Sequence, residues 1–343
     1  MRRCTKCILP ETFAGIEFDE NGICNVCQSR EERRKIDWQT REEEFKAILE
    51  ECKSRAIRTN APYDIVVPFS GGKDSTYTLY TMVKEYGMKP LVVSFNHCFF
   101  TEVIKENQEK TLRALAVDHI MFTPNWEIVK KLCAKSFRLT GDFCWHCHCG
   151  VYAFPMQIAA KYKIPSVIWG STDYTLEDNI PIDRKRFETD ISLGVKPEDM
   201  VQDGITLNDL RPWVYPVDEE LEGVISINHG AYEFWDVRKQ LGIIKKELGW
   251  RGSIVEGSYA NHDKVECKYI GVRDYIKFIR RGYGRSAQLA SVDIRDGLMT
   301  REGALKVIEE YDGKRPSSLT EFLKDTGMIE EEFMWIAEKH KVY

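Results

Sequence analysis

The chain has 343 residues, of which 43% are hydrophobic and 30% are charged, and its formal net charge at pH 7 is -5. This composition is typical of a globular protein with a sizeable core, and the length suggests about two domains. The charge disfavours binding of nucleic acid or anionic membranes through an overall basic field, and no apolar run reaches the roughly 18 residues of a membrane span. The first residues do not resemble a signal peptide, so we expect a cytoplasmic protein.

The first 30 residues contain two Cys-x-x-Cys pairs. Cys4 and Cys7 form the first pair, and Cys24 and Cys27 form the second. Four thiolates complete the tetrahedral coordination of zinc and leave no open position, so this pattern predicts a structural Zn2+ site. Buried cysteines without a metal are the alternative. With the charged helical stretch that follows, we expect this zinc-binding module to occupy residues 1–57.

Between residues 58 and 215, short apolar segments alternate with helical ones. Apolar strands in such an alternation predict an α/β domain with a doubly wound parallel sheet, covered by helices on both faces. Ligands bind such sheets beyond the carboxyl ends of the strands. From about residue 216 the pattern becomes mainly helical, which predicts a helical C-terminal region at 216–343. The four predicted strands are Ile65–Phe69, Leu91–Phe95, His119–Phe122 and Ser166–Trp169.

The segment after the first predicted strand reads Ser70-Gly71-Gly72-Lys73-Asp74-Ser75. Its glycines allow a tight turn whose N–H groups face an anion, and the helix that follows adds free N–H donors. The segment does not match the Walker pattern. It resembles the SGGxDS loop of the PP-loop ATP pyrophosphatases, also called adenine nucleotide alpha hydrolases, which cleave ATP between the α and β phosphates. An ordinary glycine turn is the alternative.

Two further strand ends carry polar residues that agree with this loop. Ser94 and Asn96 end the second strand, where the PP-loop superfamily usually contacts adenine or ribose. Gly170 and Ser171, with Asp173 close behind, follow the fourth strand and resemble the second glycine-containing motif of the superfamily. The resemblance therefore implies that these residues bind ATP together with the loop.

A third Cys-x-x-Cys lies between the loop and the fourth strand, at Cys144 and Cys147. It resembles the motif of PP-loop tRNA thiolases that ligates an iron–sulfur cluster with a later cysteine, and Cys267 is the candidate for that third ligand. Alternatively, His146 or His148 completes a second zinc site. Core cysteines at the start of a helix are the interpretation without a metal.

The chain as a whole resembles the N-acetyl sugar amidotransferases, PP-loop enzymes of lipopolysaccharide and flagellar glycan biosynthesis. The resemblance rests on the motifs above and on two basic ones, Arg281-Gly282-Tyr283-Gly284-Arg285 and Arg301-Glu302-Gly303. It implies conversion of an acetamido group of a bacterial sugar into an acetamidino group. ATP would adenylate the amide oxygen, and ammonia would then displace AMP.

The resemblance also implies roles for individual residues. Lys73 with Mg2+ would hold the leaving pyrophosphate, and Asp74 and Asp173 are candidate magnesium ligands. Arg281 and Arg285 are candidates for binding a sugar carboxylate or a nucleotide phosphate. A solvated basic face is the alternative for these arginines.

The ammonia is expected to come from other chains. A triad-type glutaminase commonly has a histidine two residues before a glutamate, and the sequence contains no His-x-Glu. The resemblance implies a glutaminase and a barrel subunit similar to those of imidazole glycerol phosphate synthase, and an acetamido sugar, nucleotide-linked or acidic, as substrate. The main rival interpretation is a PP-loop tRNA-modifying enzyme, which the acidic charge balance disfavours.

Overall fold

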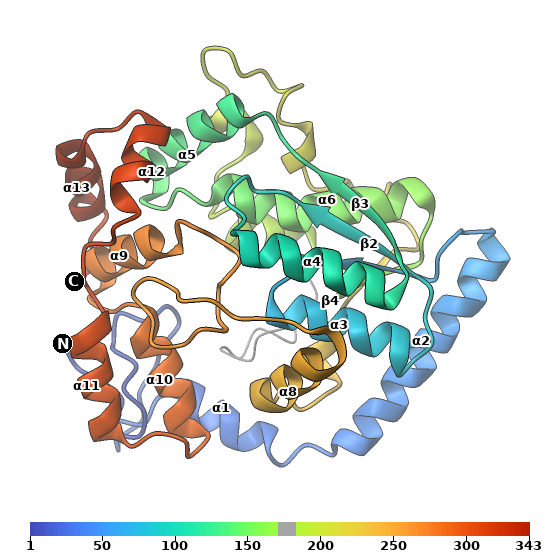
Figure 1. Ribbon diagram of the computed structural model, residues 1–343, viewed down its shortest axis with the longest axis horizontal. Coiled ribbons are helices and arrows are strands. Elements are labelled where there is room, and N and C mark those ends of the chain that lie inside the picture. The colour runs from blue at the N-terminus through green and yellow to red at the C-terminus, as the bar shows by residue number, and fades with distance from the viewer. Residues whose placement is uncertain (171–182) are drawn as a thin grey trace.

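The computed structural model describes residues 1–170 and 183–343 (Figure 1). A five-stranded parallel sheet with the strand order β3-β2-β1-β4-β5 lies at its centre. The first four strands confirm the prediction of a parallel α/β sheet, and the region after residue 216 is mainly helical as predicted, although it also contributes the fifth strand, β5. The strands are β1 (Ile65–Pro68), β2 (Pro90–Phe95), β3 (Asp118–Phe122), β4 (Ser166–Trp169) and β5 (Ile225–Asn228).

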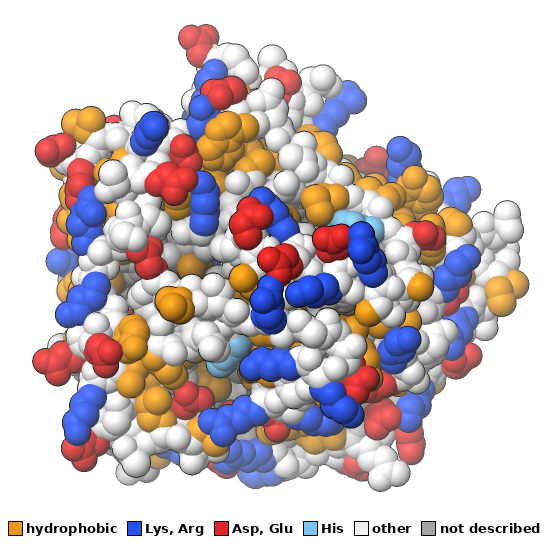
Figure 2. Space-filling model, viewed as in Figure 1, with side chains coloured by type: hydrophobic (Ala, Val, Ile, Leu, Met, Phe, Trp, Pro, Cys, Tyr) orange, Lys and Arg blue, Asp and Glu red, His pale blue; other side chains and the backbone are white. Residues whose placement is uncertain are grey.

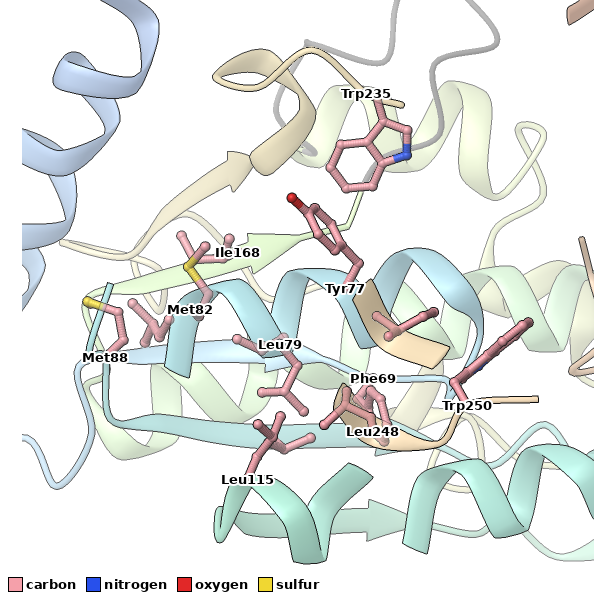
Figure 3. Close-up of a cluster of buried hydrophobic side chains, with 14 of the residues drawn as sticks. Phe69, Tyr77, Leu79, Met82, Met88, Leu115, Ile168, Trp235, Leu248 and Trp250 are labelled. Carbon is pink, nitrogen blue, oxygen red and sulfur yellow. The ribbon is translucent and has the colours of Figure 1, made fainter. Parts of the chain in front are cut away.

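Helices cover both faces of the sheet, as expected for strands that are apolar on both sides. Because side chains alternate along a strand, Ile65 and Val67 pack into one core and Val66 packs into another. The first core is shared with α3 (Lys73–Lys84), α4 (Glu102–Leu115) and α8 (Val237–Leu248), and the second with α6 (Trp145–Tyr162). In the first core, Tyr77 and Trp235 lie edge to face with ring centres 5.7 Å apart (Figure 3).

The strand order determines where a ligand site can form. From β1 the chain proceeds to β2 and β3 on one side, and then returns to β4 on the other side of β1. The connections after β1 and β4 therefore diverge and leave a crevice beyond the carboxyl ends of these two strands. Ser70–Ser75 follows β1 and Gly170 follows β4, so both reach this crevice.

The N-terminal part contains two helices where the sequence indicated one from about residue 31 to 52. The chain breaks between them at 34–37, where the Asp37 side chain accepts hydrogen bonds from the N–H groups of Gln39 and Thr40 and so caps the second helix. These helices are α1 (Asn25–Arg33) and α2 (Trp38–Thr59).

The remaining helices form two further cores beside the sheet and the helices that cover it. α5 packs with α9, α12 and α13 in a third core that contains Phe137, Phe322 and Phe333. The cysteine-rich segment packs on α10 and α11, so the two ends of the chain share a core and lie on the same side of the molecule (Figure 1). None of the described helices is both long and apolar enough to cross a bilayer. The bounds are α5 (Trp126–Thr140), α9 (Ile270–Arg281), α10 (Arg285–Arg295), α11 (Arg301–Tyr311), α12 (Leu319–Thr326) and α13 (Glu330–Lys339).

Candidate active site

The loop after β1 is held in shape by its own hydroxyl groups. The N–H of Ser70 donates to Ser75 Oγ at 3.2 Å, and the N–H of Gly72 donates to Ser70 Oγ at 3.2 Å. From outside the loop, Trp250 Nε1 donates to the carbonyl of Gly71 at 3.0 Å. These bonds preorganise the turn at the start of α3, where the first N–H groups of the helix have no partner within the helix.

Glycine is required at two positions around this loop. Gly71 has φ +81, and a Cβ there would lie 2.6 Å from Gln108 Cγ. At Gly170 a Cβ would lie 2.9 Å from the backbone oxygen of Asp74, so only glycine lets the end of β4 approach the loop this closely. The structure therefore brings Gly170 against the loop. Ser171 and Asp173 lie outside the described residues.

Lys73 lies almost completely buried at the base of the loop. Its Nζ is 2.7 Å from Asp74 Oδ2 and 3.2 Å from Asp263 Oδ1. Asp74 Oδ1 accepts from Trp235 Nε1 at 3.1 Å, and Asp263 Oδ2 accepts from Arg285 Nη1 at 3.1 Å. Burial raises the pKa of Asp263, but Lys73 and Arg285 outweigh burial and hold it below its usual range. The loop lysine is therefore held between two carboxylate side chains.

The two arginines of the first basic motif serve the fold. Arg285 is buried and binds both carboxylate oxygens of Asp274, at 2.9 and 3.1 Å, in addition to Asp263. Arg281 Nη1 donates to the carbonyl of Thr12 at 2.8 Å and so ties α9 to the cysteine-rich segment. A solvated basic face is therefore wrong for Arg285, because this side chain has carboxylate partners inside the protein.

A cavity of about 420 Å³ lies beyond the carboxyl ends of β1 and β4. The loop and Gly170 form one wall, and a segment that precedes and begins α9 forms another. Glu266 of that segment lies close to the loop, because a Cβ at Gly72 would be 3.4 Å from its Oε2. The lining residues from the second wall include His262, Asp263, Lys264, Glu266, Cys267 and Arg273.

Cys144, Cys147 and Cys267 line this same cavity together with His148. Burial raises the pKa of both Cys147 and Cys267 to about 12, so each thiol is neutral at pH 7 unless a metal binds it. His146 instead is buried against Cys133 and the carbonyl of His97.

The three cavity cysteines do not form a preassembled cluster. Among the described residues, potential metal-ligand atoms that all lie within 4.8 Å of one another belong to the four N-terminal cysteines. The fold thus places Cys144, Cys147 and Cys267 around one cavity, and a single zinc ion there would require their sulfur atoms to move closer.

Ser94 and Asn96 are not among the residues that line the cavity. Ser94 is buried, with its Oγ donating to the carbonyl of Phe69 at 2.5 Å and lying 2.8 Å from His119 Nε2. The Asn96 amide donates to Thr123 Oγ1 at 3.2 Å. Their assignment to adenine or ribose stays a prediction.

The four N-terminal cysteines form a buried cluster that is ready to bind a metal. Cys4 Sγ is 4.0 Å from Cys27 Sγ, and Cys7 Sγ is 3.7 Å from Cys24 Sγ. Four sulfurs at 2.3 Å from a zinc ion would lie about 3.8 Å apart, so the spacing fits tetrahedral zinc. The N–H of Cys24 donates to Cys4 Sγ at 3.2 Å, which favours a thiolate there.

Arg301, from the second basic motif, holds this cluster in place. Its Nη1 donates to the carbonyl of Cys4 at 2.7 Å and also to the carbonyl of Cys7. The side chain projects from the start of α11, so the cysteine cluster and the C-terminal helices form one structural unit.

The sequence analysis missed Asp263, Glu266 and Trp235. Asp263 and Glu266 are polar residues in a turn-rich stretch and match no motif. The one signal near them was Cys267, already a candidate ligand. Trp235 carries no local signal, because its role depends on the approach of the segment before α8 to the loop.

The comparison with protein families bears on this second wall. Residues 256–342 match the C-terminal domain of the WbpG-like LPS biosynthesis proteins. This region is similar to WbpG. The match supports the resemblance to the N-acetyl sugar amidotransferases. The WbpG-like segment includes Asp263, Glu266 and Cys267, so it supplies part of the cavity that contains the PP-loop.

Comparison with other proteins adds little more. No curated protein matches the chain. Among solved structures, the chain is similar to the U34-tRNA thiolase NcsA from Methanococcus maripaludis with its [4Fe-4S] cluster, at 13% identity over 91% of this chain and 87% of that chain. The TM-score of 0.34 is too low to support a conclusion about fold or function.

Proposed function

We propose that this protein is an ATP-dependent amidotransferase that converts an acetamido group of a bacterial sugar into an acetamidino group. One observation carries the proposal: Asp263 of the WbpG-like segment is bonded to Lys73 of the PP-loop, in the wall of one cavity. The segment that relates the chain to LPS biosynthesis thus surrounds the loop that is typical of ATP pyrophosphatases.

The proposed reaction balances in two steps. The amide oxygen attacks the α-phosphorus of ATP, and the bond to pyrophosphate breaks. Ammonia then adds to the activated carbon, and AMP leaves with the former amide oxygen. Amide oxygen alone is a poor leaving group, so adenylation is the step that makes substitution feasible. The work of the protein is to neutralise phosphate charge and to position the two reactants.

The loop residues suit the first step. Lys73 forms ion pairs with Asp74 and Asp263, and a phosphate that displaces Asp74 would supply the lysine with another anionic partner. The first N–H groups of α3, which have no partner within the helix, would add donors for a phosphate at this helix start. Asp74 and Glu266 offer the hard carboxylate oxygens that Mg2+ prefers, and Mg2+ held there would neutralise charge on the pyrophosphate. Asp173 remains a further candidate ligand.

The proposal also includes two metal sites, a source of ammonia and a cellular location. Zinc at the four N-terminal cysteines is structural, because the site has no open position. A second zinc ion or an iron–sulfur cluster would be held by Cys144, Cys147 and Cys267. Ammonia would come from a glutaminase through a barrel subunit, both similar to those of imidazole glycerol phosphate synthase. The protein would act in the cytoplasm.

A tRNA thiolase is the second candidate function. The observation that favours it is the presence of three cysteines in the wall of the PP-loop cavity. The net charge of -5 disfavours it, because tRNA binding relies on a positively charged surface. Retention on immobilised tRNA at low salt, with thiolated nucleoside as product, would favour this candidate over the amidotransferase.

The experiment that tests the proposal is a screen of acetamido sugars, free and nucleotide-linked, for AMP and amidine formation with ATP, Mg2+ and ammonium. We expect Lys73→Met to abolish AMP release. Lys84→Met is the matched control, since Lys84 is exposed at the other end of α3. Release of AMP without amidine, from any sugar, would contradict the proposal.

A further inference from the structure

A second hollow, of about 570 Å³, lies beside the PP-loop cavity. It is bounded by α1, by the segment that leads into α8, and by α10, which all lie in the lower half of Figure 1. We call this hollow the α1–α10 cleft. Figure 2 shows Lys and Arg side chains gathered over this lower part of the same face. Nothing in the proposed mechanism uses the cleft.

Arg295, at the end of α10, lines the cleft and is 7% exposed. Its Nη1 is buried without a hydrogen-bond partner, and no carboxylate of the described residues is paired with it. Arg285 at the other end of α10 is similarly buried but binds Asp274 and Asp263. Burial of a charged side chain without a partner is unfavourable, and a bound anion would relieve this cost. Arg295 therefore indicates that an anion belongs in the cleft.

The aspartates of the cleft do not pair with Arg295, because each already accepts hydrogen bonds from other groups. Asp296 accepts two hydrogen bonds from Arg30, at 2.9 and 3.0 Å. Asp293 accepts from the Tyr259 hydroxyl at 2.6 Å, and Asp236 caps α8. Five arginines line the cleft against these three aspartates, namely Arg30, Arg33, Arg34, Arg238 and Arg295.

Aromatic side chains accompany the arginines. Phe234 and Tyr259 are half-buried in the wall of the cleft, and the Arg30 guanidinium lies over the Phe234 ring at 4.5 Å from its centre. Aromatic side chains beside arginines are suited to stack a planar base next to its phosphates.

The cleft and the PP-loop cavity share a wall. His262 lines both spaces. Trp235 lines the cleft while its indole N–H donates to Asp74 in the loop. The cleft and the cavity are therefore neighbouring spaces, and a long ligand with its anionic end in the cleft would have to pass His262 to reach the loop where ATP is expected.

We propose that the α1–α10 cleft binds a nucleoside diphosphate, with Arg295 on the diphosphate and the base against Phe234 and Tyr259. In the proposed function, this group is the carrier of the sugar, and the sugar extends past His262 to the adenylation site. The assignment of the sugar rests on the proposed function, whereas the nucleotide site itself does not.

Calorimetric binding of UDP, CDP and GDP to the full chain, saturated with an α,β-methylene analogue of ATP, tests the inference. We expect one of the three to bind once per chain without displacing the analogue. Arg295→Met should weaken that binding about 10- to 100-fold, the effect of losing a hydrogen bond to a charged group, and leave affinity for the analogue within about twofold.

A second variant keeps the test decisive if Arg295→Met does not fold. Ser29 lies on the α1 wall and makes no hydrogen bond that shapes the cleft, so Ser29→Trp should block it by volume alone. Glu32→Trp places the same ring on an exposed position of α1 outside the cleft and should bind normally. Competition of all three nucleotides with the ATP analogue, or unchanged binding to Ser29→Trp, would overturn the inference, as would binding of tRNA alone in the cleft. Because no turnover is measured, absence of amidine formation would contradict only the proposed function.

Discussion

Lys73 Nζ lies 3.2 Å from Asp263 Oδ1, and both side chains are almost completely buried. The two residues are 190 positions apart in the sequence. One belongs to the PP-loop at the end of β1, and the other to the WbpG-like segment. A buried ion pair thus fixes the position of the loop lysine relative to the part of the chain that forms the second wall of its cavity.

This ion pair predicts an acid-sensitive contribution to stability. Asp263→Asn should lower the free energy of unfolding by about 1–3 kcal/mol at pH 7, because Lys73 and Arg285 each lose a charged partner. The pKa of Asp263 is held below its usual range in the folded state, so the stabilisation is full above the unfolded pKa of about 3.9 and is lost as the pH falls below it.

Denaturant unfolding at pH 7 and near pH 3 measures this effect. The difference between wild type and variant should shrink in acid. Asp203→Asn, at an exposed loop position, is the control and should cause no such difference. A gap between wild type and Asp263→Asn that stays constant with pH would show that the carboxylate is not stabilised in the fold.

The N-terminal cluster predicts one tightly bound zinc ion per chain. Cys24→Ser should remove one equivalent and also lower the melting temperature, because the cluster is bonded through Arg301 to the C-terminal helices. Elemental analysis with thermal unfolding tests both results. Cys98→Ser, outside the cluster, should keep the metal, and unchanged zinc in Cys24→Ser would refute the assignment.

A second metal predicts a separate equivalent. Cys147→Ser should lose that equivalent and retain the zinc of the N-terminal cluster, since the two sets of cysteines lie in different cores. Iron, sulfide and zinc analysis of protein purified without oxygen would identify the metal. If the wild-type protein contains a single equivalent, the three cavity cysteines are thiols in the native enzyme.

Adenylation predicts the fate of the amide oxygen. With oxygen-18 in the acetamido carbonyl, the label should appear in AMP, because the bond from this oxygen to phosphorus survives while its bond to carbon breaks. Mass spectrometry of the nucleotide products reads this directly. Label in inorganic phosphate instead would mean phosphoryl activation at the γ-phosphate, which conflicts with a PP-loop mechanism.

The source of ammonia gives the last prediction. The purified single chain should use ammonium salts, with a rate that rises with pH as the neutral fraction increases, and should be inactive with glutamine. The reason is that the sequence has no His-x-Glu arrangement for a triad-type glutaminase. Addition of a glutaminase and its barrel subunit should restore the use of glutamine, and glutamine-dependent turnover by the single chain would disprove the prediction.

Features with a local cause could be predicted from the sequence. The residues Ser70–Ser75 are contiguous in the sequence. Their glycines, hydroxyls and lysine therefore lie together in any turn that leads from a strand into a helix. The strands β1 to β4 were recognisable because each is a short apolar run between helical segments. The four N-terminal cysteines were predictable for a similar reason, since their spacing alone suits tetrahedral coordination.

Other features depended on tertiary structure. The strand β5 reads Ile-Ser-Ile-Asn, so its sequence lacks the continuous apolar run that marked the other strands. Ser94 stands at a strand end as predicted, but its hydroxyl is bonded to the carbonyl of Phe69 because neighbouring strands fix where each side chain points. Neither feature could be predicted from the residues next to it in the sequence.

The sequence by itself determined that this protein has a PP-loop motif on a parallel sheet and four N-terminal cysteines with the spacing of a metal site. Only the tertiary structure decided that Asp263 neutralises Lys73, that Arg285 serves this pair, and that Arg295 faces a cleft without a partner. The physical reason is that an ion pair depends on the distance between two charges. For residues far apart in the chain, that distance is set by the packing of the helices and strands between them.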